Sequence, residues 1–301
     1  MNELSEIDLY KLGLLRLVAD LRSFTAAAEK AGISQSAITR QIQSMESQLG
    51  VKLLERTTRS VTLTEPGAIL LRETEAVPNL LSGAMRRIRE EYLDIRKEIR
   101  VGISTELTLT HIPGIFHGQE RSHPDVRILV SQESDGSLFD RVRTNGLDLA
   151  IVCGAGKMLD QVEVIHTIDD QFWLVASKES VIPEEGGSSA NWRKWASDQK
   201  WLFPPETSAT RGLIDGWVAT LGLKPKPSME MENHDLMVQL VALGMGVAFV
   251  PRRALSGFSR RHKVVRVPVP IELCRKLVAV VPRFTSVPEH VRNFVSGILF
   301  S

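Results

Sequence analysis

Five side chains with amide, hydroxyl or guanidinium groups lie close together near the start of the chain. They are Gln35, Ser36, Thr39, Arg40 and Gln43. Amide and guanidinium groups can hydrogen-bond base edges in the major groove, and hydroxyls and cations can also contact phosphates. The chemistry that these residues could supply is therefore nucleic-acid recognition. The alternative is the ordinary polar face of a helical bundle.

Two short helices joined by a glycine turn would present these side chains. Ser23 can cap a helix that ends near Ala31, Gly32 permits a sharp turn, and Ser34 can cap a second helix that ends before Gly50. Apolar residues in the second helix recur at spacings of four, three and four, which predicts one buried face. That face contains Ile38, Ile42, Met45 and Leu49, and an earlier apolar helix with Leu9, Leu12, Leu15 and Val18 would complete a three-helix core.

A polar turn and a charged helix follow. Residues 51–54 and 60–63 read as two short strands around a turn, a β-hairpin wing in which Arg56 and Arg59 could contact the DNA backbone or minor groove. For each arginine the alternative is solvated turn charge. Thr64 and Pro66 mark the start of the next helix, and Pro78 predicts a kink or restart within it.

A coiled-coil seam is predicted along this linker helix. Its apolar residues repeat at four, three, four and three, which indicates a dimer; the alternative is packing against the chain's own second domain. The seam residues are Leu81, Met85, Ile88, Tyr92 and Ile95.

Composition limits the possible classes of protein. The 301 residues are 43% hydrophobic and 24% charged, an ordinary globular mixture, and the formal net charge is only +1. Any nucleic-acid function must therefore rest on local charge. Such charge is found between residues 30 and 60, where Lys30, Arg40, Lys52, Arg56 and Arg59 outnumber Glu46 and Glu55. The chain has no recognisable signal sequence and no apolar run of bilayer length, so we expect a cytoplasmic protein without membrane contact.

The two cysteines, Cys153 and Cys274, are too few for a disulfide framework or a thiolate metal site. We expect two buried thiols. The alternative is a redox pair, in which Arg275 would favour a Cys274 thiolate. No G-x-S-x-G elbow is present, the spacing of His111, His117 and His123 does not suit a metal site, and no cofactor is expected.

From residue 100 onwards, strand and helix patterns alternate, which predicts a largely parallel α/β domain. Helices are expected over residues 213–221, 236–243 and 288–300, and a polar loop over residues 183–191. The predicted strands cover residues 100–104, 126–131, 147–152, 162–168, 172–176, 201–203, 228–232, 247–250, 264–267 and 277–281.

The stretch SFTAAAEKAGISQSAITRQIQSMESQLGVKLLERTTRSVTLTEPG, which starts at Ser23, resembles the LysR-type transcriptional regulators. Ser36 stands where many members carry proline, and Leu54 replaces a frequent phenylalanine. The resemblance implies an α/β protein with an N-terminal winged helix-turn-helix (residues 1–67), a long linker helix used for dimerisation (68–97) and a two-lobed, periplasmic-binding-protein-like effector domain (98–301). The first lobe would be about residues 98–168 and 272–301, and the second about 169–271.

The resemblance also implies partners and site residues. The partners are double-stranded operator DNA, a small-molecule effector and a second copy of the chain, in a homodimer or homotetramer. Gln35, Ser36, Thr39, Arg40 and Gln43 would contact DNA, with Arg59 as the wing contact; Arg56 is a candidate from the wing pattern alone. The effector would lie where strands end and helices begin, because free backbone N–H groups there attract an anion. Residues at such positions are Ser104, Thr105, Gln132, Cys153, Thr207, Ser208, Thr210, Arg211, Asn233 and His234.

Arg211 could pair with a carboxylate of the effector, whereas plain helix capping is the alternative for the hydroxyls. The sequence therefore predicts a DNA-binding transcriptional regulator, not an enzyme, controlled by an anionic effector. The alternative is a solute-binding or enzymatic α/β protein with an accessory winged domain. The first quarter of the chain, which such a protein would not need, favours the regulator.

Overall fold

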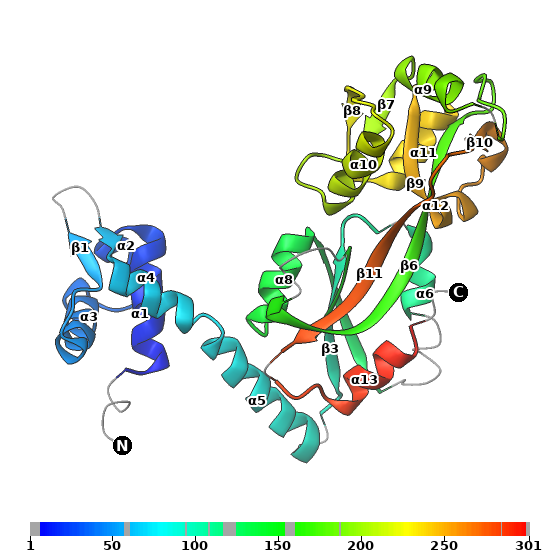
Figure 1. Cartoon of the computed structure of the whole chain (residues 1–301). Coiled ribbons are helices and arrows are strands. Elements are labelled where there is room, and N and C mark those ends of the chain that lie inside the picture. The colour runs from blue at the N-terminus through cyan, green and yellow to red at the C-terminus, as the bar shows by residue number, and fades with distance from the viewer. Residues whose placement is uncertain are drawn as a thin grey trace. The chain divides into compact units, whose positions relative to one another are not determined.

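A computed structural model of the chain describes residues 7–56, 61–93, 95–107, 109–116, 125–153, 160–186, 188–283 and 285–298. The chain forms two compact units, residues 1–88 and residues 89–301 (Figure 1). Within the described ranges, every helix is too short or too polar to cross a bilayer.

The first unit is built on three helices, α1 (Leu9–Leu21), α2 (Phe24–Ala31) and α3 (Gln35–Leu49). The predicted caps are present: the Ser23 hydroxyl accepts a hydrogen bond from Ala26 N, and the Ser34 hydroxyl accepts one from Ala37 N. Gly32 ends α2 with a φ of 68°, a left-handed conformation that glycine adopts without strain. The predicted helix-turn-helix is therefore confirmed.

One member of the predicted apolar face of α3 is not buried. Ile38, Ile42 and Met45 are fully buried, whereas Leu49 is 42% exposed. Leu49 is the last residue of the helix, and Glu46 is buried one turn earlier instead. The spacing of the apolar residues located the buried face of α3 correctly. It could not show that the Glu46 side chain, rather than Leu49, is buried at the end of this face.

The wing consists of β1 (Leu54–Arg56) paired antiparallel with β2 (Val61–Leu63). The first strand begins at Leu54 rather than at residue 51, because residues 51–53 do not pair with β2. The Glu46 carboxylate accepts hydrogen bonds from the backbone N–H groups of Leu53 and Leu54, which fixes the start of β1 against α3.

The linker is two helices, α4 (Glu65–Glu73) and α5 (Val77–Tyr92). Thr64 caps α4 as predicted, and its hydroxyl also donates to the Lys52 carbonyl oxygen. Pro78 lies in the first turn of α5, where its missing N–H costs no helical hydrogen bond. The predicted restart at Pro78 is confirmed, and α5 ends at Tyr92, before the last predicted seam residue, Ile95.

The second unit is organised around one mixed sheet. Its strand order is β4-β3-β5-β11-β6-β9-β7-β8, with β10 paired to β6. The strands are β3 (Glu98–Ser104), β4 (Arg127–Glu133), β5 (Leu149–Cys153), β6 (Val162–Ser177), β7 (Trp201–Phe203), β8 (Pro227–Glu230), β9 (Val247–Pro251), β10 (Val264–Arg266) and β11 (Leu273–Pro282).

The sheet has a parallel group at each end and an antiparallel middle. Strands β4, β3 and β5 pair in parallel and form the first lobe, and β8, β7 and β9 do the same in the second lobe. The long strands β6 and β11 pair antiparallel and run through both lobes (Figure 1). The prediction of a largely parallel domain is therefore corrected to a mixed sheet.

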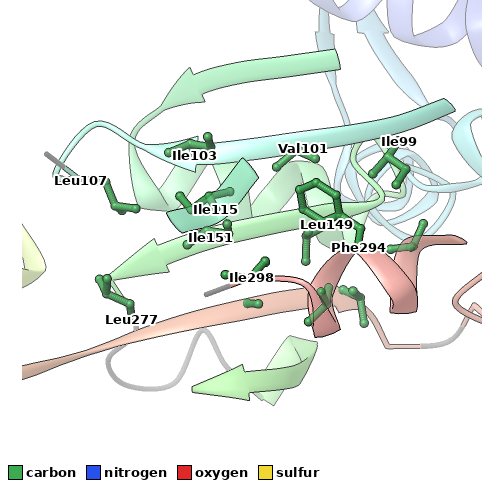
Figure 2. Packing of buried hydrophobic residues seen from close by; sticks show 14 of the residues in the cluster. Ile99, Val101, Ile103, Leu107, Ile115, Leu149, Ile151, Leu277, Phe294 and Ile298 are labelled. Atoms are coloured by element: carbon green, nitrogen blue, oxygen red, sulfur yellow. The ribbon is translucent and has the colours of Figure 1, made fainter. Parts of the chain in front are cut away.

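Helices cover both lobes. They are α6 (Ile112–Phe116), α8 (Asp135–Arg143), α9 (Ser189–Ser197), α10 (Ala209–Thr220), α11 (His234–Ala242), α12 (Arg252–Ser256) and α13 (Glu289–Ser296), with the 3-10 turns η1 (Leu109–His111) and η3 (Arg261–Lys263). In the first lobe, Phe294 of α13 packs with Leu149 of β5 and Leu277 of β11 in one buried apolar cluster (Figure 2).

Three sequence predictions need correction here. Helix α8 was not predicted, and α9 begins at Ser189, inside the predicted loop. The two strands predicted over residues 162–168 and 172–176 are one strand, β6. Asp170, between the two predicted strands, is held within β6 by Arg275 and His111.

Candidate functional site

Helix α3 presents a polar surface opposite its apolar face. Gln35, Ser36, Arg40 and Gln43 are exposed, and Thr39 is half-buried. The Arg40 Nε group donates weakly to the Ser36 carbonyl oxygen at 3.4 Å, so the guanidinium remains at the helix surface. This arrangement leaves amide, hydroxyl and guanidinium groups available to a partner.

Glu46 holds this surface in position relative to the wing. Its carboxylate lies 2.8 Å from Lys52 Nζ and accepts from Leu53 N and Leu54 N. Burial raises the pKa of Glu46, but these hydrogen bonds outweigh burial and leave the pKa below the ordinary 4.5. Lys52 is thus partly neutralised. Of the predicted wing contacts, Arg56 is described only by its backbone, and Arg59 lies outside the described residues.

The second unit contains a cavity of about 580 Å3 between the two lobes. The first lobe contributes the loop after β3, the start of α8 and the end of β5; the second contributes the start of α10 and the loop before α11. The lining residues are Thr105, Glu106, Ser134, Asp135, Gly136, Phe139, Cys153, Thr207, Ser208, Ala209 and Glu232.

Four of the ten predicted effector contacts line this cavity: Thr105, Cys153, Thr207 and Ser208. Three others, Ser104, Thr210 and His234, are buried outside the lining, each with 2% or less of its surface exposed. Gln132, Arg211 and Asn233 are not among the lining residues either. Asn233 caps α11 by accepting a hydrogen bond from Leu236 N at 2.9 Å.

Arg211 is held by other groups outside the cavity lining. Its guanidinium donates to Asp215, to Glu230 at 2.8 Å and to the Pro204 carbonyl oxygen, and it stacks over Phe203. Because two carboxylates already compensate its charge, Arg211 is a poor candidate for binding a ligand carboxylate.

A buried charge cluster centred on Arg275 of β11 adjoins the cavity through Glu106. The Arg275 side chain is 1% exposed; it donates to Asp170 Oδ2 at 2.8 Å and to the Thr210 hydroxyl at 2.9 Å, and pairs with Glu106 Oε2 at 3.4 Å. The Thr210 hydroxyl donates in turn to Glu106. Since Glu106 belongs to the first lobe and Thr210 to α10, the cluster joins the two lobes through a strand that runs through both.

Two histidines adjoin this cluster. His111 Nε2 lies 3.4 Å from Asp170 Oδ1. His234 packs edge-on against Phe172, and neither of its ring nitrogens has a hydrogen-bond partner among the described residues. Burial lowers the pKa of His234 to about 3, so the ring is neutral at physiological pH.

Asp135 is the least compensated acid of the cavity lining. Its Oδ2 accepts from Cys153 N at 3.1 Å, whereas Oδ1 is buried without a hydrogen-bond partner among the described residues. The nearby Ser104 hydroxyl favours the ionised carboxyl but does not reach Oδ1 in hydrogen-bond geometry. Burial raises the pKa of Asp135 to about 6, and the neighbouring Glu106 adds to the rise.

The cysteines differ from their prediction. Both are free, but only Cys153 is buried; Cys274 is exposed, because residues alternate along β11 and the inward position belongs to Arg275. Arg275 therefore acts on Asp170 and Glu106 rather than on the Cys274 thiol. Burial raises the pKa of both thiols, most strongly that of Cys153, so neither carries the features of an activated thiolate.

Sequence reasoning missed Glu106, Ser134, Asp135 and Glu232 in the lining. Glu106 and Glu232 directly adjoin predicted contacts, so widening each predicted site by one residue would have included them. Ser134 and Asp135 form the start of α8, and the signal for them was the Ser-Asp-Gly turn after a predicted strand. Among the described residues, no cluster of three or more His, Cys, Asp or Glu side chains could hold a metal ion.

A helix-turn-helix with an exposed polar recognition face, joined by linker helices to a two-lobed α/β unit with a cavity between its lobes, defines a ligand-responsive DNA-binding regulator. Two family models match the chain: "Bacterial regulatory helix-turn-helix protein, lysR family" over residues 9–68, and "LysR substrate binding domain" over residues 76–299. The chain belongs to the LysR family of transcriptional regulators and is not an enzyme.

Relatives and solved structures agree with this assignment. The chain is 28% identical to the uncharacterized HTH-type transcriptional regulator YfeR of Shigella flexneri, over 82% of the chain and 79% of YfeR. It is 26% identical to the transcriptional dual regulator GltC of Bacillus subtilis, over 87% of the chain and 89% of GltC. Full-length CbnR, solved in complex with its target DNA, is similar in fold, with a TM-score of 0.65 and 17% identity over 97% of this chain and 99% of CbnR.

Proposed function

We propose that this regulator reads operator DNA with the exposed face of α3 and that a small molecule in the lobe cavity controls its affinity for that DNA. The observation that carries the proposal is the division of α3, with Ile38, Ile42 and Met45 fully buried and Gln35, Ser36, Arg40 and Gln43 at the surface. Such a helix can lie in the major groove without disturbing its own core.

A binding titration with Arg40→Ala tests the DNA half of this proposal. If Arg40 contacts a base edge, the variant should lose about 1 to 3 kcal/mol of binding free energy and relax specificity at one position. The measurement is fluorescence anisotropy with the DNA upstream of the protein's own gene, at fixed salt. Arg72→Ala is the matched control, since it removes an exposed arginine from α4 of the same unit. Equal binding by both variants would contradict the assignment of Arg40.

The cavity half is tested with Thr105→Val, which removes a lining hydroxyl at nearly constant volume. The variant should bind operator DNA normally but lose its response to cell-extract metabolites that change the affinity of the wild-type protein. A normal response would exclude Thr105 as a ligand contact. The helix starts of α8 and α10 would favour an anionic effector, as predicted, but Arg211 does not line the cavity and the described lining includes no cation to pair with one.

We also propose that two copies associate through α5. This helix has no buried residue in the single chain, and its apolar side chains are largely exposed: Met85 by 47% and Tyr92 by 77%. Burying them against a second copy would remove this apolar surface from water. Met85→Asp should shift the sedimentation of the protein towards the monomer, whereas Ser82→Asp, an equal change at a polar position of α5, should not.

A further inference from the structure

All three charged side chains in the described lining of the cavity are acidic. They are Glu106, Asp135 and Glu232, from three different segments of the chain. Glu106 is buried, Asp135 is half-buried and Glu232 is exposed. An ionised carboxylate can only accept hydrogen bonds. Glu106 already accepts from Thr210 and Arg275, so Asp135 and Glu232 are the lining acids that a ligand donor could satisfy.

Arg275 and Arg211 already pair with carboxylates, one of which is Glu106 of the lining. Arg275 is shared between Asp170 and Glu106, and Arg211 between Asp215 and Glu230. Among the described residues, neither Asp135 nor Glu232 has an ion-pair partner, and Asp135 Oδ1 has no hydrogen-bond donor. The protein itself therefore compensates the carboxyl of Asp135 incompletely.

The rest of the lining supplies both apolar and hydroxyl surface. Phe139 and Ala209 offer apolar contact, and Thr105, Ser134 and Thr207 offer hydroxyls. Ser134 precedes α8 without forming a side-chain cap, so its hydroxyl is not engaged by the first turn of the helix. The apolar and hydroxyl groups can thus contact the body of a small polar molecule, and the acidic side chains can bind a positively charged group on it.

We propose that the effector is a small molecule bearing a protonated primary amine, which binds between Asp135, Glu106 and Glu232. This inference rests on the proposed function, because it assigns a ligand class to the same cavity. The three N–H donors of an ammonium group match acceptor-only carboxylates, and its charge compensates Asp135. A dicarboxylate would face three acidic side chains, and the described part of the lining has no cation to offset them.

The source of the amine can be an amino acid or a diamine, and the two are separated by the probes used. We would screen the full-length protein by thermal shift against the standard amino acids, linear diamines and linear dicarboxylates. Compounds that stabilise the protein would then be titrated by calorimetry and tested for their effect on binding to its upstream DNA. We expect at least one amine to bind. If a diamine binds with the same Kd as the amino acid of equal chain length, the protein does not recognise the carboxylate of the amino acid.

Glu232→Gln is the main variant, because Glu232 is exposed and its loss should not affect folding. It should raise the Kd of the bound amine by about tenfold to a hundredfold, the usual worth of a charge-assisted hydrogen bond. Glu206→Gln is the matched control, since Glu206 is exposed beside Thr207 but does not line the cavity. Equal effects of the two substitutions would overturn the inference, as would a screen in which no amine binds.

The inference and the proposed function fail in different ways. If a dicarboxylate and no amine changes DNA affinity, and Thr105→Val abolishes that response, the ligand class is wrong while the proposed function stands. If an amine binds and is weakened by Glu232→Gln, yet no bound compound changes DNA affinity, the ligand class stands and the proposed control of DNA binding fails.

Discussion

Each unit of the molecule has a carboxylate with little or no exposure at one or both oxygens beside its candidate functional surface, and the two carboxylates have opposite environments. Glu46, on the buried side of α3, receives donors from Lys52, Leu53 and Leu54, and its pKa lies below the ordinary value. Asp135, in the cavity wall, has one fully buried oxygen without a donor, and its pKa is raised to about 6. A compensated acid stabilises the fold, whereas an uncompensated one marks a place where a ligand can supply what the protein lacks.

The Arg275 cluster gives the strongest test of this contrast, because it is the compensated site next to Asp135. Arg275→Met should lower the free energy of unfolding by ~3–5 kcal/mol, since Asp170 and Glu106 would remain buried without their cation. Urea unfolding followed by tryptophan fluorescence measures this, because all five tryptophans lie in the second unit. Lys276→Met, at an exposed neighbouring position of β11, is the control and should leave stability almost unchanged.

Glu46→Ala tests the compensated acid of the first unit and should cost ~1–3 kcal/mol, because two buried N–H groups lose their acceptor. Hydrogen exchange of the Leu53 and Leu54 amides reports the loss locally, with Glu55→Ala as an exposed control. The folded-state pKa of Glu46 is lowered, so its contribution is complete above pH 4.5 and is lost as pH falls through that lower pKa. Unchanged exchange at neutral pH would contradict the assigned role.

Asp135→Asn should have the opposite sign, and its effect should vanish at low pH. The folded-state pKa of about 6 exceeds the ordinary 3.8, so the wild-type protein loses stability as pH rises between these values. The variant should therefore gain at most about 3 kcal/mol relative to wild type at pH 8 and almost nothing near pH 4. Asparagine keeps an oxygen for Cys153 N, and Asp140→Asn on the same helix is the control. An equal gain in the free energy of unfolding at pH 4 and pH 8 would contradict the conclusion that the Asp135 carboxylate lacks compensation.

The sequence predicted the framework of the first unit because its signals are local. The Ser23, Ser34 and Thr64 caps, the Gly32 turn and the Pro78 restart each depend on a few adjacent residues. The burial of Glu46 was not predictable in the same way, since its donors lie beyond the end of its helix. A buried glutamate within an apolar helix face contradicts the hydrophobic pattern, and only the positions of its hydrogen-bond donors explain it.

The cavity was harder to predict because its chemistry depends on distant pairings. Strand ends and helix starts pointed to Thr105, Cys153, Thr207 and Ser208, which line the cavity. They could not indicate that Arg211 is bound by Glu230, or that Arg275 faces inward while Cys274 faces solvent. The expected charge of the ligand rested on Arg211 and on helix N-termini, and therefore changed once these pairings were visible.

The strand β11 also has a consequence for the order in which the protein folds during synthesis. Leu277 of β11 and Phe294 of α13 belong to the core of the first lobe, together with Ile99 and Leu149 from much earlier in the chain (Figure 2). The ribosome therefore releases the strands of the first lobe long before it delivers their last partners. The lobe that is begun first is completed last, and until then its apolar face is available to chaperones or to other nascent chains.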